Sequence, residues 1–442
     1  MEINKFHYRS IDNELLEWKN FTPRKPLLLR GARQVGKSTA VKALSKHFKY
    51  YIELNFEEKP NLKSLFESNL EVSEICENLA IIFKKPIIEG ETLIFLDEIQ
   101  ACVSAMGILR YFYEKLPDLH IIAAGSLLEF ALHELPSFGV GRIRSVFMYP
   151  FSFDEFLIAI GDNGLLGQKK LASPENPLLS IYHEQLLKHY KTFLLIGGMP
   201  EVVAKYAGKN KISEIQDTLD DLIISMKADF VKYKKRIPSS RILEIFESVA
   251  AQMGGKFVLK NASNTINHLQ IKESLELLIM AGLVIPVTHT SANGIPLGAE
   301  SDIKKRKMLL LDTGIFQRIL GLEIADILLE NDFDVINKGS IAELFVGLEL
   351  VKYHSTNSPK QLFYWHRETA SSNAEVDYVE QKQQDIIPIE VKASGKGSMQ
   401  SLYQFLSDKN RPFGIRVSTE NFAVYDKIKV YPIYAVSNIA NL

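Results

Sequence analysis

Residues Gly31 to Ser38 have the sequence GARQVGKS, and this octapeptide decides the fold of the N-terminal part of the chain. It fits the spacing G-x-x-x-x-G-K-[ST] at every fixed position. Gly31 and Gly36 allow backbone conformations that turn successive N–H groups toward phosphate oxygens. Lys37 is expected to lie along the β- and γ-phosphates of a nucleotide, and the Ser38 hydroxyl to ligate Mg²⁺. The octapeptide therefore predicts a phosphate-binding loop.

The surroundings of the loop agree with this prediction. An apolar run from Pro26 to Arg30 precedes it, and helical spacing begins at Lys37. Further strand-like runs cover Tyr51 to Leu54, Leu93 to Leu96 and Leu119 to Ala124, with helical patterns between them. Strands that alternate with helices favour an α/β fold with a parallel sheet.

Two acids end the strand at Leu93 to Leu96. Asp97 is expected to hold Mg²⁺ through its water shell. Glu98 is placed to orient and deprotonate a water that attacks the γ-phosphate. The alternative is a strand that ends in two acids with no catalytic role, which the phosphate loop makes the weaker interpretation.

Two further residues are candidates for the same site. Ser126 ends the next strand, where it could contact the γ-phosphate or the attacking water, or simply cap the helix at Leu127. Arg142 is a candidate arginine finger, in cis or toward a neighbouring subunit, with a surface arginine as the alternative. The predicted catalytic residues are Glu98, Lys37, Ser126 and Arg142. The predicted nucleotide-binding residues are Gly31, Ala32, Arg33, Gln34, Val35, Gly36, Lys37, Ser38, Thr39 and Asp97, with Ser38 and Asp97 on the metal.

Several segments together resemble a prokaryotic family of AAA-type P-loop ATPases fused to a C-terminal domain of unknown function. They are GARQVGKST, LIFLDEIQ, AAGSLLEF, the Gly141-Arg142 pair and the stretch from Tyr149 to Phe156. The resemblance covers nearly the whole chain. It implies an AAA-type core with an extra strand between the two nucleotide motifs, a helical lid, ATP as the nucleotide and a homo-oligomer.

The rest of the chain divides by its patterns. We expect the ATPase core in residues 1–150 and a helical lid in 151–235, where the spacing becomes helical. Helices followed by a hairpin indicate a winged-helix-like domain in 236–312. Residues 313–442 return to mixed helices and strands, as in a small α/β domain.

That last region contains a second candidate site. Asp377 lies on one strand of a predicted hairpin, and Glu390 and Lys392 share a face of the other. Two carboxylates can chelate Mg²⁺ or Mn²⁺ while a lysine activates water. The pattern resembles the PD-(D/E)XK nuclease superfamily, in which Glu343 matches an acid on the first helix. An exposed charged hairpin is the alternative, and Val376 stands where that superfamily has proline.

Composition limits the remaining possibilities. The chain has 442 residues, with 52 Lys and Arg against 53 Asp and Glu, so DNA affinity must come from local basic runs. Such runs occur at Lys232 to Arg236 and at Lys304 to Lys307, and an exposed basic face is their alternative interpretation. Two cysteines and no membrane-length apolar stretch favour a cytoplasmic protein without a membrane partner.

The sequence thus predicts Mg²⁺-dependent ATP hydrolysis, coupled to conformational change in a C-terminal module that binds nucleic acid and has candidate nuclease residues. The alternative is a nucleotide-gated protein-interaction switch whose nuclease-like domain is inactive.

Overall fold

The computed structural model describes residues 7–134, 141–233, 237–323, 338–367, 374–395, 397–440 and 442. Its Cα positions form two compact units. Unit 1 comprises Met1–Pro150 with Met280–Gly282 and Ser355–Pro359, and unit 2 comprises the rest of the chain. Each unit is described by itself below.

Unit 1 is an α/β unit with a five-stranded parallel sheet in the order β2-β3-β4-β1-β5. Its elements are α1 (Ser10–Asn20), β1 (Leu27–Arg30), α2 (Lys37–Ser45), β2 (Tyr50–Asn55), α3 (Lys63–Glu67), α4 (Val72–Phe83), β3 (Thr92–Asp97), α5 (Val103–Lys115), β4 (His120–Ala124), α6 (Leu128–Glu134) and β5 (Arg144–Phe147). The strands predicted from the sequence are β1 to β4. Strand β4 lies between β1 and β3, so the expected extra strand separates the two nucleotide motifs.

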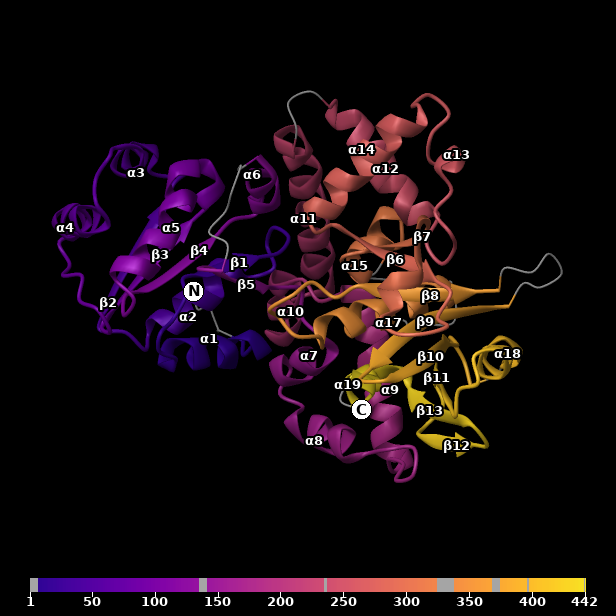
Figure 1. Cartoon of the computed structure of the whole chain (residues 1–442). Helices are drawn as coiled ribbons and strands as arrows, with labels where there is room; N and C mark the ends of the chain where they lie inside the picture. The colour runs from indigo at the N-terminus through magenta and orange to yellow at the C-terminus, as the bar shows by residue number, and fades with distance from the viewer. Residues whose placement is uncertain are drawn as a thin grey trace. The chain divides into compact units, whose positions relative to one another are not determined.

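Alternating side chains explain why helices cover both faces of this sheet. Leu28, Ile94 and Leu96 belong to one apolar cluster with residues of α3, α4 and α5, including Phe66, Leu79 and Leu109. Helices α1 and α2 pack together, and α2 contacts β3 and β4. Figure 1 shows these helices around the indigo and purple strands. The central strands β3 and β4 are fully buried, as expected when a parallel sheet is covered on both sides.

Unit 2 begins with helices and ends with a mixed sheet. Its helices are α7 (Phe153–Ala159), α8 (Asn163–Leu171), α9 (Ser180–Ile196), α10 (Pro200–Ala207), α11 (Ile212–Tyr233), α12 (Ser239–Ala251), α13 (Leu259–Ala262), α14 (His268–Met280), α15 (Thr313–Ile319), α17 (Lys338–Lys352), α18 (Gln400–Asp408) and α19 (Val436–Ala440). Its strands are β6 (Val284–Thr290), β7 (Ser301–Leu310), β8 (Leu362–His366), β9 (Glu375–Lys382), β10 (Asp385–Val391), β11 (Gly414–Ser418), β12 (Ala423–Tyr425) and β13 (Ile428–Pro432).

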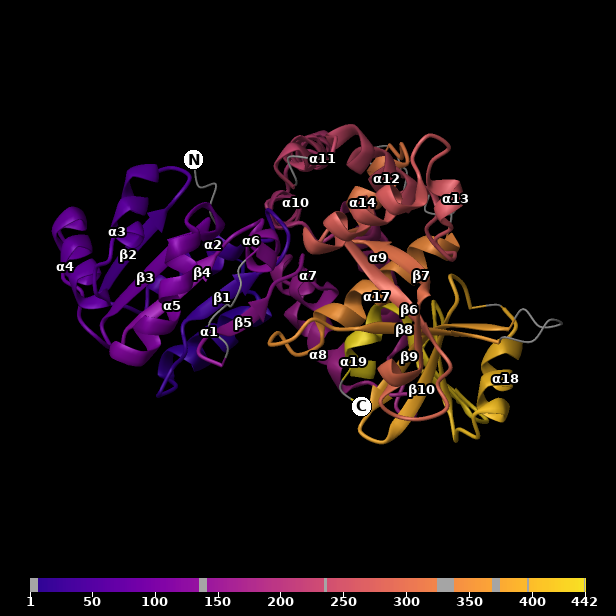
Figure 2. The same ribbon diagram turned by 45° about the horizontal axis from the view of Figure 1, so that its top comes forward.

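The strands of unit 2 form one eight-stranded sheet in the order β12-β13-β11-β10-β9-β8-β6-β7 (Figure 2). The expected hairpin is present, with Ile389 of β10 opposite Tyr378 of β9 in an antiparallel pair. Helix α17 contacts β7 and β10, and α18 contacts β9, β10 and β11.

This sheet changes the interpretation of residues 236–312. The predicted helices and hairpin form, but β6 pairs in parallel with β8, with Val287 opposite Leu362. The hairpin β6–β7 therefore lies at one edge of the larger sheet, and a winged-helix-like domain in 236–312 stays a prediction. Its residues Val287 and Leu309 are buried, so the hairpin has apolar surface that the neighbouring elements of unit 2 cover. The helices of residues 151–233 belong to this same compact unit.

Candidate nucleotide site and C-terminal acid cluster

The phosphate loop connects β1 to α2 through a backbone that most residues avoid. Gly31 and Gly36 have φ of 138° and 98°, and Gln34 has φ of 64°. A Cβ atom on Gly31 would lie 2.2 Å from the carbonyl oxygen of Met148, so no larger residue fits. Helix α2 then begins at Lys37, and its first N–H groups face the loop.

Lys37 is folded back onto its own loop. Its ammonium donates to the carbonyl oxygens of Gly31 at 2.9 Å and Ala32 at 2.8 Å, and the side chain is buried. Burial lowers the pKa of Lys37 to about 8, although the carboxylates of Glu98 and Asp97 act in the opposite direction. Neutral carbonyls are its direct partners, so the ammonium can exchange them for an anionic phosphate at little cost.

The two predicted metal ligands are adjacent. The Ser38 hydroxyl donates to Asp97 Oδ2 at 3.1 Å, while Asp97 Oδ1 accepts the N–H of Glu98 at 3.1 Å. Burial, and then the neighbouring Glu98, raise the pKa of the Asp97 carboxyl. A hydroxyl and a carboxylate are oxygen ligands of the kind that Mg²⁺ prefers, so these residues fit the ion.

Glu98 is held by two side chains at the ends of neighbouring segments. Its Oε2 accepts from Gln100 Nε2 at 2.6 Å, and from the N–H and hydroxyl of Ser126 at 3.3 Å each. The sequence pointed to Ser126 but missed Gln100. Gly125 is the signal that could have found it, because a Cβ there would lie 1.9 Å from Gln100 Oε1.

Arg9 also belongs to this neighbourhood and was not predicted. Its guanidinium donates to the carbonyl oxygen of Val35 in the loop at 3.2 Å and to that of Tyr149 at 2.7 Å. The side chain is only 8% exposed. The partners are 26 and 140 residues away in sequence, so no local pattern marks the residue.

The structure does not bring Arg142 to the phosphate loop. Arg142 precedes β5, whose first residue Arg144 pairs with Leu27 at the start of β1. It forms an ion pair with Glu114, near the end of α5 that leads back toward the start of β4. Both observations place Arg142 at the amino edge of the sheet, whereas the phosphate loop follows the carboxyl edge. A role toward the nucleotide of the same chain does not fit, and a role toward a second copy stays a prediction.

The second candidate site is a cluster of acids around a buried lysine. Lys307, on β7, lies 2.8 Å from Glu343 on α17, 2.6 Å from Glu375 on β9 and 3.6 Å from Asp377 on β9. Beside it, Lys392 pairs with Glu390 at 2.7 Å. Asp377 Oδ2 also accepts the N–H of Val391 at 2.8 Å.

The electrostatics of the cluster are those of a buried ion-pair network. Burial alone would lower the pKa of Lys307, but Glu343, Asp377 and Glu375 together raise it above its usual value. Burial raises the pKa of the Glu343 and Glu390 carboxyls to about 7, and it raises that of Asp377 as well. The four predicted residues of this site therefore lie in one neighbourhood, but the sequence missed Lys307 and Glu375.

Family models match three successive parts of the chain. Residues 23–157 match an AAA domain. The segment is therefore similar to AAA domains, and we refer to residues 23–157 as the AAA domain. Residues 187–326 and 338–436 match two domains of unknown function, DUF8612 and DUF4143. The expected C-terminal domain of unknown function is thus found, while its nuclease-like character stays a prediction.

The solved structures that are similar to the chain include the following two. The Walker-type ATPase PABY2304 of Pyrococcus abyssi has 17% identity and a TM-score of 0.45, with 71% of this chain and 96% of that chain covered. The ORC1 protein of Aeropyrum pernix in complex with DNA has 13% identity and a TM-score of 0.30, with coverages of 74% and 96%. At such scores neither likeness bears on function. A search of curated proteins finds no match.

Outside the AAA domain, the basic run from Lys304 to Lys307 is less free than its sequence indicates. Lys305 lies 3.7 Å from Asp302, and Arg306 lies 3.1 Å from Glu276. Lys307 is buried in the acid cluster, so it cannot face DNA phosphates. Lys304 remains exposed. Residues 234–236 of the other basic run lie outside the described residues.

The Asp312-Thr313-Gly314 segment has a structural role in unit 2. The buried Asp312 carboxylate accepts the N–H groups of Gly198 at 2.6 Å and Ile315 at 3.1 Å, which caps α15. A Cβ on Gly314 would lie 2.5 Å from the carbonyl oxygen of Ile196. The turn at Gly197 and Gly198 after α9 therefore contacts the start of α15, and this contact holds α9 against α15.

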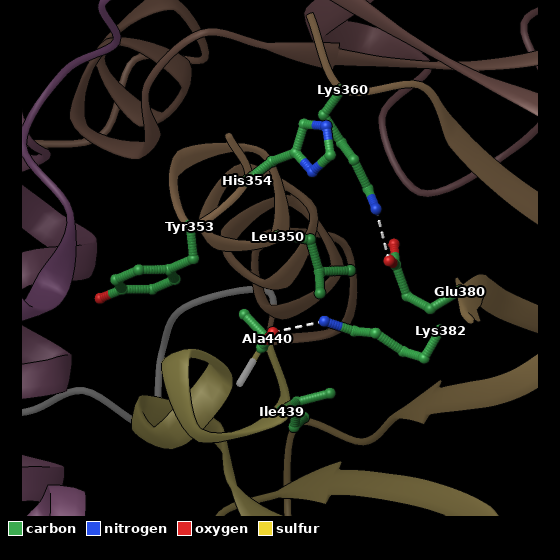
Figure 3. Close-up of a pocket in the computed structure, with 8 residues that line it drawn as sticks. All are labelled: Leu350, Tyr353, His354, Lys360, Glu380, Lys382, Ile439 and Ala440. Carbon is green, nitrogen blue, oxygen red and sulfur yellow. Dashed lines mark hydrogen bonds and ion pairs between the residues drawn. The ribbon is translucent and has the colours of Figure 1, made fainter. Parts of the chain in front are cut away.

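A small cavity in unit 2 lies beside the end of α17 (Figure 3). Its lining includes Lys360, which pairs with Glu380 at 2.5 Å, and Lys382, which donates to the carbonyl oxygen of Ala440. Its volume of about 20 Å³ holds about one water molecule. It is too small for a substrate. Within the described residues, no helix has the length and apolar character needed to cross a bilayer.

Proposed function

We propose that the AAA domain binds ATP with Mg²⁺ and hydrolyses it. The observation that carries the proposal is the joint placement of Lys37, Ser38 and Asp97, with the Ser38 hydroxyl 3.1 Å from Asp97 Oδ2. Lys37 leaves the carbonyl oxygens of its own loop and contacts the β- and γ-phosphates. Ser38 and Asp97 would hold Mg²⁺, which supplies positive charge to the phosphates when it is bound.

Glu98 has the second role in this proposal. Its Oε2 is engaged by Gln100 and Ser126, and we propose that Ser126 leaves the carboxylate when Glu98 accepts a proton from water. Ser126 is then free to contact the γ-phosphate or the attacking water. We infer that the Glu98–Gln100–Ser126 arrangement is the resting state of the site, in which the base is held in a defined place.

Phosphate release from ATP tests the proposal. In Glu98→Gln we expect turnover to fall about 10²- to 10⁴-fold while ATP still binds, because the general base is lost. In Lys37→Ala we expect ATP affinity to fall about 30-fold or more, because a buried charge contact to phosphate is lost. Lys42→Ala is the matched control, since Lys42 lies on the same helix but is largely exposed. Unchanged turnover in both Glu98→Gln and Lys37→Ala would contradict the proposal.

For unit 2 we propose an interaction role gated by the nucleotide state. Each predicted nuclease carboxylate has a lysine or backbone partner, and this observation favours an inactive cluster over a hydrolytic one. The competing proposal is a nucleic-acid-binding module that cleaves DNA or RNA.

Cleavage assays separate these two roles of unit 2. Wild type and Asp377→Asn are incubated with DNA and RNA in the presence of Mg²⁺ or Mn²⁺, and ATP turnover is measured with and without DNA. We expect no cleavage by either protein. Cleavage that Asp377→Asn abolishes would contradict the interaction role, and DNA-stimulated turnover would support nucleic-acid binding.

A further inference from the structure

The ammonium of Lys307 occupies the middle of the acid cluster. It reaches there from β7, while Glu343 comes from α17 and Glu375 and Asp377 come from β9. The side chain is 2% exposed and lies 5.3 Å from the centroid of the Tyr364 ring. A lysine so enclosed by acids and an aromatic ring is a fixed part of the fold and not a mobile surface group.

The acids around Lys307 do not fit a divalent metal ion. Glu343 Oε1 is bound to Lys307, Glu390 Oε1 to Lys392, and Asp377 Oδ2 to the N–H of Val391. Across the part of the chain that the structure describes, no three His, Cys, Asp or Glu residues are grouped to hold a metal. The nuclease resemblance implies such an ion between these residues, so structure and resemblance disagree here.

One buried carboxylate oxygen of the cluster accepts no hydrogen bond from the part of the chain that the structure describes. Glu390 Oε2 is buried and has no hydrogen-bond partner among the described residues. A dication at this oxygen would lie close to the ammonium groups of Lys307 and Lys392, whose charge would repel it.

We propose that the Lys307 ammonium is the resident cation of this cluster and excludes a divalent metal from it. The lysine thereby fastens β7 to α17 and β9 and leaves unit 2 without a metal-dependent hydrolytic centre. The inference deepens the interaction role proposed for unit 2, and it is independent of ATP hydrolysis in the AAA domain.

Mn²⁺ binding tests the inference without any activity assay. The full chain carries Asp97→Asn to remove the metal ligand of the AAA domain, and bound Mn²⁺ is measured by electron paramagnetic resonance without nucleotide. We expect no Mn²⁺ in the cluster of this protein. Adding Lys307→Met should create Mn²⁺ binding at least about tenfold tighter than the weakest binding that the measurement detects, because one positive charge leaves a site of low dielectric. Adding Asp377→Asn as well should abolish the gain.

Lys360→Met is the matched control. Lys360 is also largely buried and ion-paired, with Glu380 on β9, but it lies outside the acid cluster. We expect it to bind no additional Mn²⁺. If folded Lys307→Met shows no gain, the inference is overturned.

The protein that retains Lys307 decides the question if Lys307→Met does not fold. One Mn²⁺ bound to that protein and lost with Asp377→Asn would overturn the exclusion of metal. Absence of such binding supports it. A failure of the ATP experiments would change neither outcome, so the two proposals fail separately.

Discussion

Lys37 in the AAA domain and Lys307 in unit 2 are both buried, but their partners differ. Lys37 donates to two neutral carbonyl oxygens of its own loop, and burial lowers its pKa to about 8. Lys307 lies among three carboxylates, which outweigh burial and raise its pKa. A buried lysine whose direct partners are neutral is prepared for an anionic ligand. One whose partners are carboxylates has its counter-charge already, so it contributes to the fold.

The largest effect that follows from this comparison is on stability. Lys307→Met leaves buried carboxylates without their cation, and we expect a loss of about 3–5 kcal/mol in the free energy of unfolding of unit 2. Lys37→Met removes no partner of a carboxylate at hydrogen-bond distance, so the AAA domain should lose no more than about 1 kcal/mol. Equal losses in the free energy of unfolding for Lys307→Met and Lys37→Met would contradict the different roles assigned to the two lysines.

The two tryptophans allow this measurement on the full chain. Trp18 lies in unit 1 and Trp365 in unit 2, and both are buried. Denaturant unfolding followed by fluorescence in Trp18→Phe therefore reports on unit 2, and in Trp365→Phe on unit 1. The deficit in the free energy of unfolding caused by Lys307→Met should grow as the pH rises. The carboxyls that the lysine no longer pairs then lose their protons and carry uncompensated charge in the folded state. A deficit that is the same at pH 5 and pH 8 would contradict the ion-pair explanation.

The AAA-type sheet and the nucleotide site could be predicted because their signals are local. The octapeptide fixes the loop by its own spacing, and the strands on either side are continuous apolar runs. Gln100 and Arg9 were missed because their partners come from other segments. The sequence left the place of Arg142 open for the same reason, since the edge of the sheet on which it lies depends on the direction of β5.

Lys307 shows a different limit of sequence reasoning. In the sequence it is the last residue of a basic run, which predicts an exposed wing. In the structure, β7 changes from exposed to buried at this residue, and the apolar run that begins with Met308 follows it. The strand order that brings it to Glu375 depends on the pairing of β6 with β8, which no local pattern encodes. The sequence signal for the burial of Lys307 is its position directly before the apolar run that begins with Met308.

A smaller effect separates the two lysines by their protons. At pH 8.5, Lys37 with a pKa of about 8 is mostly neutral in the free protein, whereas bound phosphate raises its pKa and restores its charge. ATP binding at this pH should therefore take up part of a proton, and ATP affinity should weaken as the pH rises further. Calorimetry in buffers of different ionisation enthalpy measures this uptake.

Lys37→Arg is the control, because arginine keeps its charge throughout and should take up no proton at this position. Lys307→Arg should leave the uptake unchanged, since Lys307 already holds its proton among carboxylates. If proton uptake persists in Lys37→Arg, the proton belongs to another group, and the assignment of Lys37 as the lysine that binds the phosphates of ATP is wrong.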